Sequence, residues 1–183
     1  MPNRSTNKVR LWTLQAPEVV AAVRASGRYR ADWDLVSANF RPAYRAVVAE
    51  MARRGIDCPD GPPVWCWPGR ALRGKAVRRT ANALLGDHEW AHGRWLLELR
   101  VPAAVTLVTS YSAWNDHLAY TFGDPDGAAA MDWTGLLHTE WDEQQVTIPE
   151  LRAEWIVRAR PYLPDAETAA RIAADPLLRA PER

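Results

Sequence analysis

The sequence is poor in cysteine, histidine and phenylalanine, and it contains no long apolar run. Its two cysteines, Cys58 and Cys66, cannot build the disulfide framework of a small secreted domain, and four histidines leave little material for a structural zinc site. No stretch is long and apolar enough to cross a bilayer, and the first residues lack the apolar core of a secretory signal. We therefore expect a cytoplasmic protein with no membrane partner.

Tryptophan, by contrast, is abundant, with ten copies against two Phe and five Tyr. The 183 residues are 48% hydrophobic and 25% charged, which is the balance of an ordinary globular protein and excludes collagen-like, coiled-coil and wholly disordered chains. We expect one compact domain over residues 8–163, followed by a C-terminal helix and a loose tail over 164–183.

The small net charge hides a division along the chain. Residues 1–100 hold 17 Lys and Arg against 9 Asp and Glu, whereas residues 101–183 hold 6 against 13. Two halves of opposite sign either attract each other across one fold or leave a basic face for a phosphate-bearing partner.

Hydrophobic periodicity and turn residues predict a mixed sequence of strands and helices. We expect strands near 9–14, 64–67, 95–101, 104–109 and 145–148, and helices over 17–26, 40–51, the end of the basic stretch to 85, a short segment after Ser110 or Ser112, and 166–174. The stretch 150–162 fits either a helix or a strand. The order of elements indicates an α+β fold, with a mixed central sheet flanked by helices.

The segment His88-Glu89-Trp90-Ala91-His92 matches the H-E-x-x-H pattern of zinc peptidases. On a helix this spacing puts two imidazoles on one face, with the glutamate placed to take a proton from metal-bound water. However, Gly86 and Gly93 bracket the pentapeptide, and a strand follows at once. A solvated turn is therefore the main interpretation, and a zinc hydrolase is an alternative.

Trp65 and Trp67 precede a basic segment, residues 70–79, that contains no acid. Aromatic faces that stack on bases and arginines that bind phosphates are the combination used by single-stranded nucleic-acid sites. Alternate positions on a strand also place both rings on one face, which is typical of a core. Core packing and a nucleic-acid-binding module both remain open.

A third set is dispersed along the chain: Arg10 on the first strand, Thr109-Ser110-Tyr111-Ser112 at the end of a middle strand, and Glu140-Trp141-Asp142-Glu143 before a late strand. Arginine suits a pyrophosphate, a hydroxyl can orient a ligand, and a carboxylate can stabilise a developing cation on a sugar. Each residue also has an ordinary structural role, as a surface strand charge, a helix cap or a solvated loop acid.

Several segments resemble the bacterial family of domains of unknown function numbered 3841. The resemblance covers most of residues 9–160. It is carried by Leu11-Trp12-Thr13-Leu14-Gln15, Gly27-Arg28-Tyr29-Arg30-Ala31-Asp32, the helix from Phe40 to Met51, Pro63-Val64-Trp65-Cys66-Trp67, Leu96-Leu97-Glu98-Leu99-Arg100-Val101-Pro102, Trp114 with Leu118, and Gln145.

The first strand, the helix after it and the Gly-x-Tyr turn also resemble the start of ADP-ribosyltransferase-like domains, which bind NAD. That resemblance implies phosphate binding by Arg10, an orienting role for Ser110 and a catalytic carboxylate at Glu143. The chain departs from the family pattern, because it has Glu140-x-x-Glu143 in place of Glu/Gln-x-Glu. This is an analogy at the level of the fold.

Together these observations predict a protein that binds a nucleotide-like ligand such as NAD, with transferase activity of the ADP-ribosyltransferase type. The cleft is expected between the first strand and the late strand. Glu143 and Ser110 are the predicted catalytic residues, no residue is assigned to a metal, and the predicted ligand-binding residues are Arg10, Trp12, Gln15, Tyr29, Trp114 and Gln145.

Overall fold

The computed structural model describes residues 7–58, 61–69, 75–123, 131–140 and 142–178. Its centre is a six-stranded sheet with the order β5-β6-β3-β1-β4-β8, in which every strand pair is antiparallel. The strands are β1 (Lys8–Gln15), β3 (Val64–Pro68), β4 (Trp95–Pro102), β5 (Leu107–Ser110), β6 (Gln144–Ile148) and β8 (Ile156–Pro161). A small ladder, β2 (Arg28–Tyr29) with β7 (Leu151–Arg152), lies apart from it. Helices complete the expected α+β fold.

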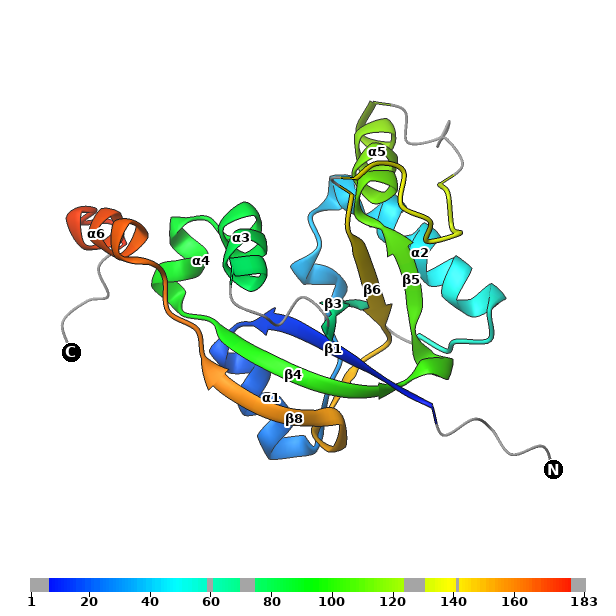
Figure 1. The fold of residues 1–183 in the computed structure, drawn as a ribbon, viewed down its shortest axis with the longest axis horizontal. Coiled ribbons are helices and arrows are strands. Elements are labelled where there is room, and N and C mark those ends of the chain that lie inside the picture. The colour runs from blue at the N-terminus through cyan, green and yellow to red at the C-terminus, as the bar shows by residue number, and fades with distance from the viewer. Residues whose placement is uncertain (1–6, 59–60, 70–74, 124–130, 141, 179–183) are drawn as a thin grey trace.

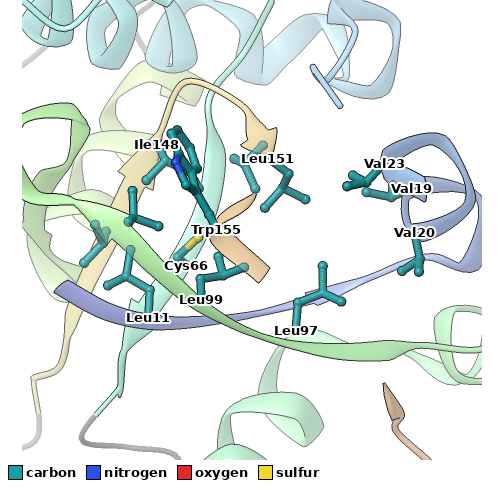
Figure 2. Close-up of a cluster of buried hydrophobic side chains, with 13 residues drawn as sticks. Leu11, Val19, Val20, Val23, Cys66, Leu97, Leu99, Ile148, Leu151 and Trp155 are labelled. Atoms are coloured by element: carbon teal, nitrogen blue, oxygen red, sulfur yellow. The ribbon is translucent and has the colours of Figure 1, made fainter. Parts of the chain in front are cut away.

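One face of the sheet is covered by α1 (Pro17–Ser26). Pro17 starts this helix, and Gly27 ends it with a φ of 77°, a left-handed conformation that glycine adopts without a Cβ penalty. The helix buries Val19, Val20 and Val23 against Leu97 and its neighbours on the sheet. Figure 2 shows these side chains gathered over β1 and β4.

The opposite face carries Trp12, Trp65 and Trp67, because Trp12 and Trp67 are cross-strand partners and Trp65 lies two residues from Trp67. We call it the tryptophan face. At one end it is covered by α2 (Arg41–Arg53) and α5 (Tyr111–Gly123), and at the other by α3 (Lys75–Leu84) and the short α4 (Asp87–His92). Figure 1 shows these two helical groups separated along the sheet.

The C-terminal helix α6 (Ala166–Ala174) packs on the second group. Asp165 caps it, accepting a hydrogen bond from the Thr168 backbone N–H at 2.9 Å. Arg171 pairs with Asp87 of α4 at 3.0 Å, and Ile172 packs against the cluster around Trp12. None of the helices in the described ranges is long and apolar enough to span a membrane.

The predicted elements are largely confirmed. However, two strands that follow each other in the sequence, β4 and β5, do not pair in the sheet. β4 pairs with β1 and β8, whereas β5 pairs with β6 at the far edge of the sheet. A single 3-10 turn, Ala103–Val105, shortens the second strand and redirects the chain. The ambiguous stretch 150–162 forms β7, a 3-10 turn over Ala153–Trp155, and β8, so the strand interpretation is correct for its second half.

Candidate functional site

Two adjoining pockets lie between the helical groups and share Trp67 and Leu84. The larger, of about 320 Å³, is the aromatic pocket, and the smaller, of about 200 Å³, is the ion-pair pocket. Together we call them the cleft. The aromatic pocket is lined by Thr13, Leu14, Gln15, Tyr29, Ala31, Leu35, Val36, Tyr44, Pro62, Pro63, Val64, Trp65, Trp67, Leu84 and Leu85, and the ion-pair pocket by Trp67, Arg79, Thr80, Ala83, Leu84, Tyr111 and Glu143.

The aromatic pocket takes its shape from β3. Pro62 and Pro63 lead into this strand, and its alternation presents both Trp65 and Trp67 to the pocket. The ring of Tyr44 from α2 meets Trp65 edge to face, with centroids 5.9 Å apart. Burial is the main influence on Tyr44, and it raises the pKa of its phenol. The phenol therefore stays protonated at neutral pH.

A short hydrogen-bond chain fixes Gln15 at the same pocket. The Gln15 side-chain amide donates to the Thr13 hydroxyl at 2.8 Å, and that hydroxyl donates to the Trp65 carbonyl at 2.7 Å. The Gln15 amide oxygen makes no hydrogen bond to the described residues. The structure thus places Gln15 and Tyr29, two of the predicted ligand-binding residues, in one pocket.

The sequence predicted that Trp12 and Trp114 bind the ligand. In the structure neither residue lines the cleft, and both lie one layer deeper. Trp12 is fully buried and stacks on Trp67, with ring centroids 5.0 Å apart. Trp114, on α5, is 5% exposed and packs against Trp65 at 4.7 Å. Helices cover both rings, so these tryptophans hold the two pocket-lining rings in place.

The ion-pair pocket joins the two helical groups. Arg79, on α3, donates a hydrogen bond to the carboxylate of Glu143, which precedes β6. The Arg79 side chain is 71% exposed and that of Glu143 38%. Because both groups are solvated, the pair contributes little to stability and can exchange partners at low cost.

Ser110 does not reach the cleft. It is 1% exposed, and its hydroxyl donates to Asp142 at 2.6 Å while accepting from the Ala113 backbone at 3.0 Å. It therefore caps α5, which is the structural role the sequence also allowed. Of the two predicted catalytic residues, Glu143 therefore lines the cleft and Ser110 does not.

Asp142 was predicted only as one acid of the segment Glu140-Trp141-Asp142-Glu143, yet it organises this region. Its carboxylate accepts hydrogen bonds from the Ser110 hydroxyl and from the backbone N–H groups of Ser112 and His138. Burial raises the pKa of Asp142, but these hydrogen bonds together outweigh burial and lower the pKa to about 2. The charged carboxylate holds the start of α5 beside Glu143.

Gln145 is also buried rather than exposed to the cleft. It is 2% exposed, and its cross-strand partner is Thr109. The Gln145 side-chain N–H₂ and the Thr109 hydroxyl have no hydrogen-bond partner among the described residues. Two unsatisfied polar groups side by side in a core are costly to bury.

Arg10 lies outside the cleft. It is exposed and lines a separate pocket of about 290 Å³ with Gly69 and Gln144. β3 lies between β1 and β6 in the sheet, and the pocket that joins Arg10 of β1 to Gln144 of β6 is lined by neither Ser110 nor Glu143. Arg10, Ser110 and Glu143 consequently share no pocket.

The H-E-x-x-H segment forms α4, a helix of six residues. Glu89 turns back to accept from the Gly86 backbone at 3.0 Å, and His92 contacts Glu18 at 2.9 Å. Within the described ranges, no group of three or more His, Cys, Asp or Glu side chains is arranged to hold a metal ion. The geometry therefore does not favour the zinc hydrolase interpretation.

The basic segment is only partly described, since residues 70–74 lie outside the described ranges. Of the rest, Arg78 donates to the Leu163 carbonyl at 2.8 Å and lies over the ring of Tyr162, and Arg79 is held by Glu143. These arginines are engaged within the fold rather than presented as a free row.

A family model described as Domain of unknown function (DUF3841) matches residues 10–147. The chain belongs to this family. The matched range of DUF3841 contains Gln15, Trp67, Arg79 and Glu143, and so covers both pockets of the cleft. No curated protein and no solved structure matches the chain.

Tyr44 is a cleft residue that the sequence reasoning left out. Arg79 was predicted only as part of the basic segment 70–79, and the opposite charges of the two halves were a second signal, because they predict contacts between an early arginine and a late acid. Nothing in the sequence distinguishes Tyr44 from the other apolar positions of its helix.

Proposed function

We propose that the cleft of this DUF3841 protein binds NAD or a similar nucleotide, and that Glu143 supports transfer of its ADP-ribosyl group. One observation carries the proposal: an aromatic pocket with a polar amide adjoins a pocket that holds an arginine and a carboxylate, and the two share Trp67 and Leu84 as lining residues. The two pockets thus bring together aromatic rings that can stack on a base, a cation that can bind phosphate, and an anion that can stabilise an electron-poor sugar.

The aromatic pocket suits a planar base. Its volume of about 320 Å³ is at the lower end of ligand pockets, enough for a base and part of its sugar. Stacking on an aromatic ring is worth roughly 1–3 kcal/mol per base. The Gln15 amide oxygen can accept a hydrogen bond from an exocyclic amino or carboxamide group, which adds specificity that stacking lacks.

The ion-pair pocket suits the sugar and phosphate. Arg79 can exchange the Glu143 carboxylate for a phosphate of the ligand, because a guanidinium binds both anions in the same bidentate way. Glu143 then faces the ribose carbon that becomes cationic when the glycosidic C–N bond breaks. Nicotinamide leaves with the electron pair of that bond, and water or another hydroxyl forms the new C–O bond and releases a proton.

Binding can be tested by titrating the protein with NAD and ADP-ribose and following tryptophan fluorescence and heat. We expect saturable binding by the wild type and affinity at least tenfold weaker in Gln15→Ala, because the amide hydrogen bond is lost. Asn115→Ala removes a matched amide from the exposed surface of α5 and should bind like the wild type. Absence of binding by any nucleotide would contradict the proposal.

The transfer of the ADP-ribosyl group is tested separately, by measuring the nicotinamide released from NAD. Glu143→Gln should lower kcat by about 100-fold or more while changing the dissociation constant only a few-fold, since the carboxylate acts on the transition state. Glu154→Gln, a change at a carboxylate outside the cleft, serves as the control. If NAD binds but no nicotinamide is released by the wild type, the cleft is a binding site and the transfer step is wrong.

A further inference from the structure

We propose that the end of the tryptophan face beyond α3 binds the phosphate backbone of a nucleic acid. Four cations gather there on three adjacent strands: Lys8 and Arg10 on β1, Arg100 on β4 and Arg158 on β8. We call them the cationic strip. The inference does not depend on the proposed transfer reaction, because it concerns a surface outside the cleft.

The strand register places these side chains on one face. Arg10 and Arg100 are direct cross-strand partners, and Lys8 lies two residues before Arg10. Trp12 is opposite Glu98, which in turn is opposite Arg158. Since side chains of paired residues point the same way, the whole strip shares the face of Trp12.

No member of the strip forms an ion pair within the described part of the chain. All four residues are exposed, and none makes a side-chain hydrogen bond, ion pair or ring contact with the described residues. Most other described arginines do, such as Arg53 with Glu50 and Arg171 with Asp87. One acid, the half-buried Glu98, lies within the strip, so positive charge remains in excess.

The directly opposed pair Arg10 and Arg100 is itself informative. Like charges facing each other across two strands destabilise a sheet, and neither arginine forms an ion pair with Glu98, the acid on the same face, or with another described residue. An anion bound between the two guanidinium groups would relieve it. The forked donors of arginine match the oxygens of a phosphate.

The extent of the strip favours a chain of phosphates over a single ion. Adjacent strands lie about 4.8 Å apart, so cations on three strands span roughly 10 Å. Figure 1 shows β1 and β4 continuing past α3 and α4, whose helices cover the rows of Trp12 and Leu96.

A membrane surface fits less well. The large apolar side chains on this face, Trp12 and Leu96, are buried under helices and cannot insert into lipid. The exposed Val157 of β8 is adjacent to Arg158 and therefore points to the other face. We therefore assign the strip to the nucleic-acid backbone.

The experiment measures anisotropy of a labelled oligouridine 20-mer, without NAD, over a series of salt concentrations. We expect wild-type binding that weakens with salt, and a double variant Arg10→Gln, Arg100→Gln that binds at least tenfold more weakly at low salt. For this variant, the slope of log K against the logarithm of the salt concentration should also be smaller in magnitude by about 1.4, because two phosphate contacts are lost.

A matched double variant, Arg28→Gln with Arg45→Gln, removes the same charge from exposed positions away from the strip. It should keep most of the affinity and the wild-type slope. Equal losses in both double variants, or no saturable binding by the wild type, would overturn the proposal. The proposal would also be overturned if the Arg10→Gln, Arg100→Gln variant lost binding to anionic lipid vesicles but kept its binding to oligouridine.

Discussion

At the scale of single residues, Asp142 is the clearest case of a charge that the fold requires. It is 6% exposed, and it gathers donors from a strand end, a helix start and a loop. A neutral amide could not accept from all three groups, because one of its two positions is itself a donor. The carboxylate is therefore specific to this junction.

We predict that Asp142→Asn lowers the free energy of unfolding by about 2–4 kcal/mol at pH 7, the loss expected for buried hydrogen bonds to a charged group. The unfolded carboxyl takes up a proton near pH 4 and the folded one near pH 2. This contribution is thus present above about pH 4 and is lost as the pH falls toward 2. The difference between wild type and variant in urea titrations should shrink on acidification.

Asp116→Asn provides the control for that comparison. Asp116 is an exposed acid on α5, and its replacement should change the free energy of unfolding by less than about 0.5 kcal/mol at any pH. A difference for Asp142→Asn that does not depend on pH would show that the hydrogen bonds do not hold its pKa down.

The tryptophans show what the sequence can and cannot predict about single residues. Trp12, Trp90 and Trp114 stand beside turns or polar groups in the chain, yet all three are buried. Trp65 and Trp67 follow a core-like alternation, yet both line the cleft. Periodicity gives the face on which a ring lies, but the helix that covers that face comes from elsewhere in the chain.

At the scale of elements, the short strand β3 decides where the cleft forms. Most strands and helices follow from local periodicity and caps, as at Pro17, Gly27 and Asp165. Strand order does not, because it depends on which distant segments bury each other. The insertion of β3 between β1 and β6 separated the predicted site residues Arg10 and Glu143.

The exit of β3 passes close to β1 at Gly69. A Cβ built there would lie 2.7 Å from the Arg10 Cβ and 2.8 Å from the Arg10 carbonyl oxygen, so the strands would have to move apart. We predict that Gly69→Ala lowers the free energy of unfolding by about 1–3 kcal/mol, the usual cost of overpacking. Chemical denaturation measures the change.

Gly123→Ala is the matched comparison, because a Cβ built at Gly123 meets nothing within 4 Å. This variant should be neutral or slightly stabilising. Equal stability of the two alanine variants would mean that the strand crossing can relax, and that the position of Trp67 is less fixed than the structure indicates.

At the scale of the whole molecule, the sheet links three buried clusters. β1 contributes Leu11 to the α1 side and Trp12 to the cluster under α3, and β3 contributes Cys66 to the first cluster. The expected attraction between the basic and acidic halves also operates across the fold, as in the pair Arg30 and Glu150 at 2.9 Å. No cluster is independent of the central strands, so we expect the chain to unfold as one cooperative unit.

The thiol of Cys66 reports on that cooperativity. It is fully buried between β1 and β6, and burial raises its pKa far above the usual range. Only the thiolate reacts readily, so labelling requires the sheet to open. The other thiol, Cys58, is 8% exposed, and burial is the main cause that raises its pKa to about 11, followed by the charge of Asp57. The variant Cys58→Ser removes the labelling signal of this second thiol.

In Cys58→Ser, we predict that the free energy of opening from thiol labelling at Cys66 equals the free energy of global unfolding from urea to within about 1 kcal/mol. Far-UV circular dichroism and tryptophan fluorescence should follow the same single transition. Labelling at a clearly lower free energy would mean that β3 detaches from β1 or β6 while the rest stays folded. The helical groups on either side of the cleft would then be able to move apart independently, which a rigid sheet forbids.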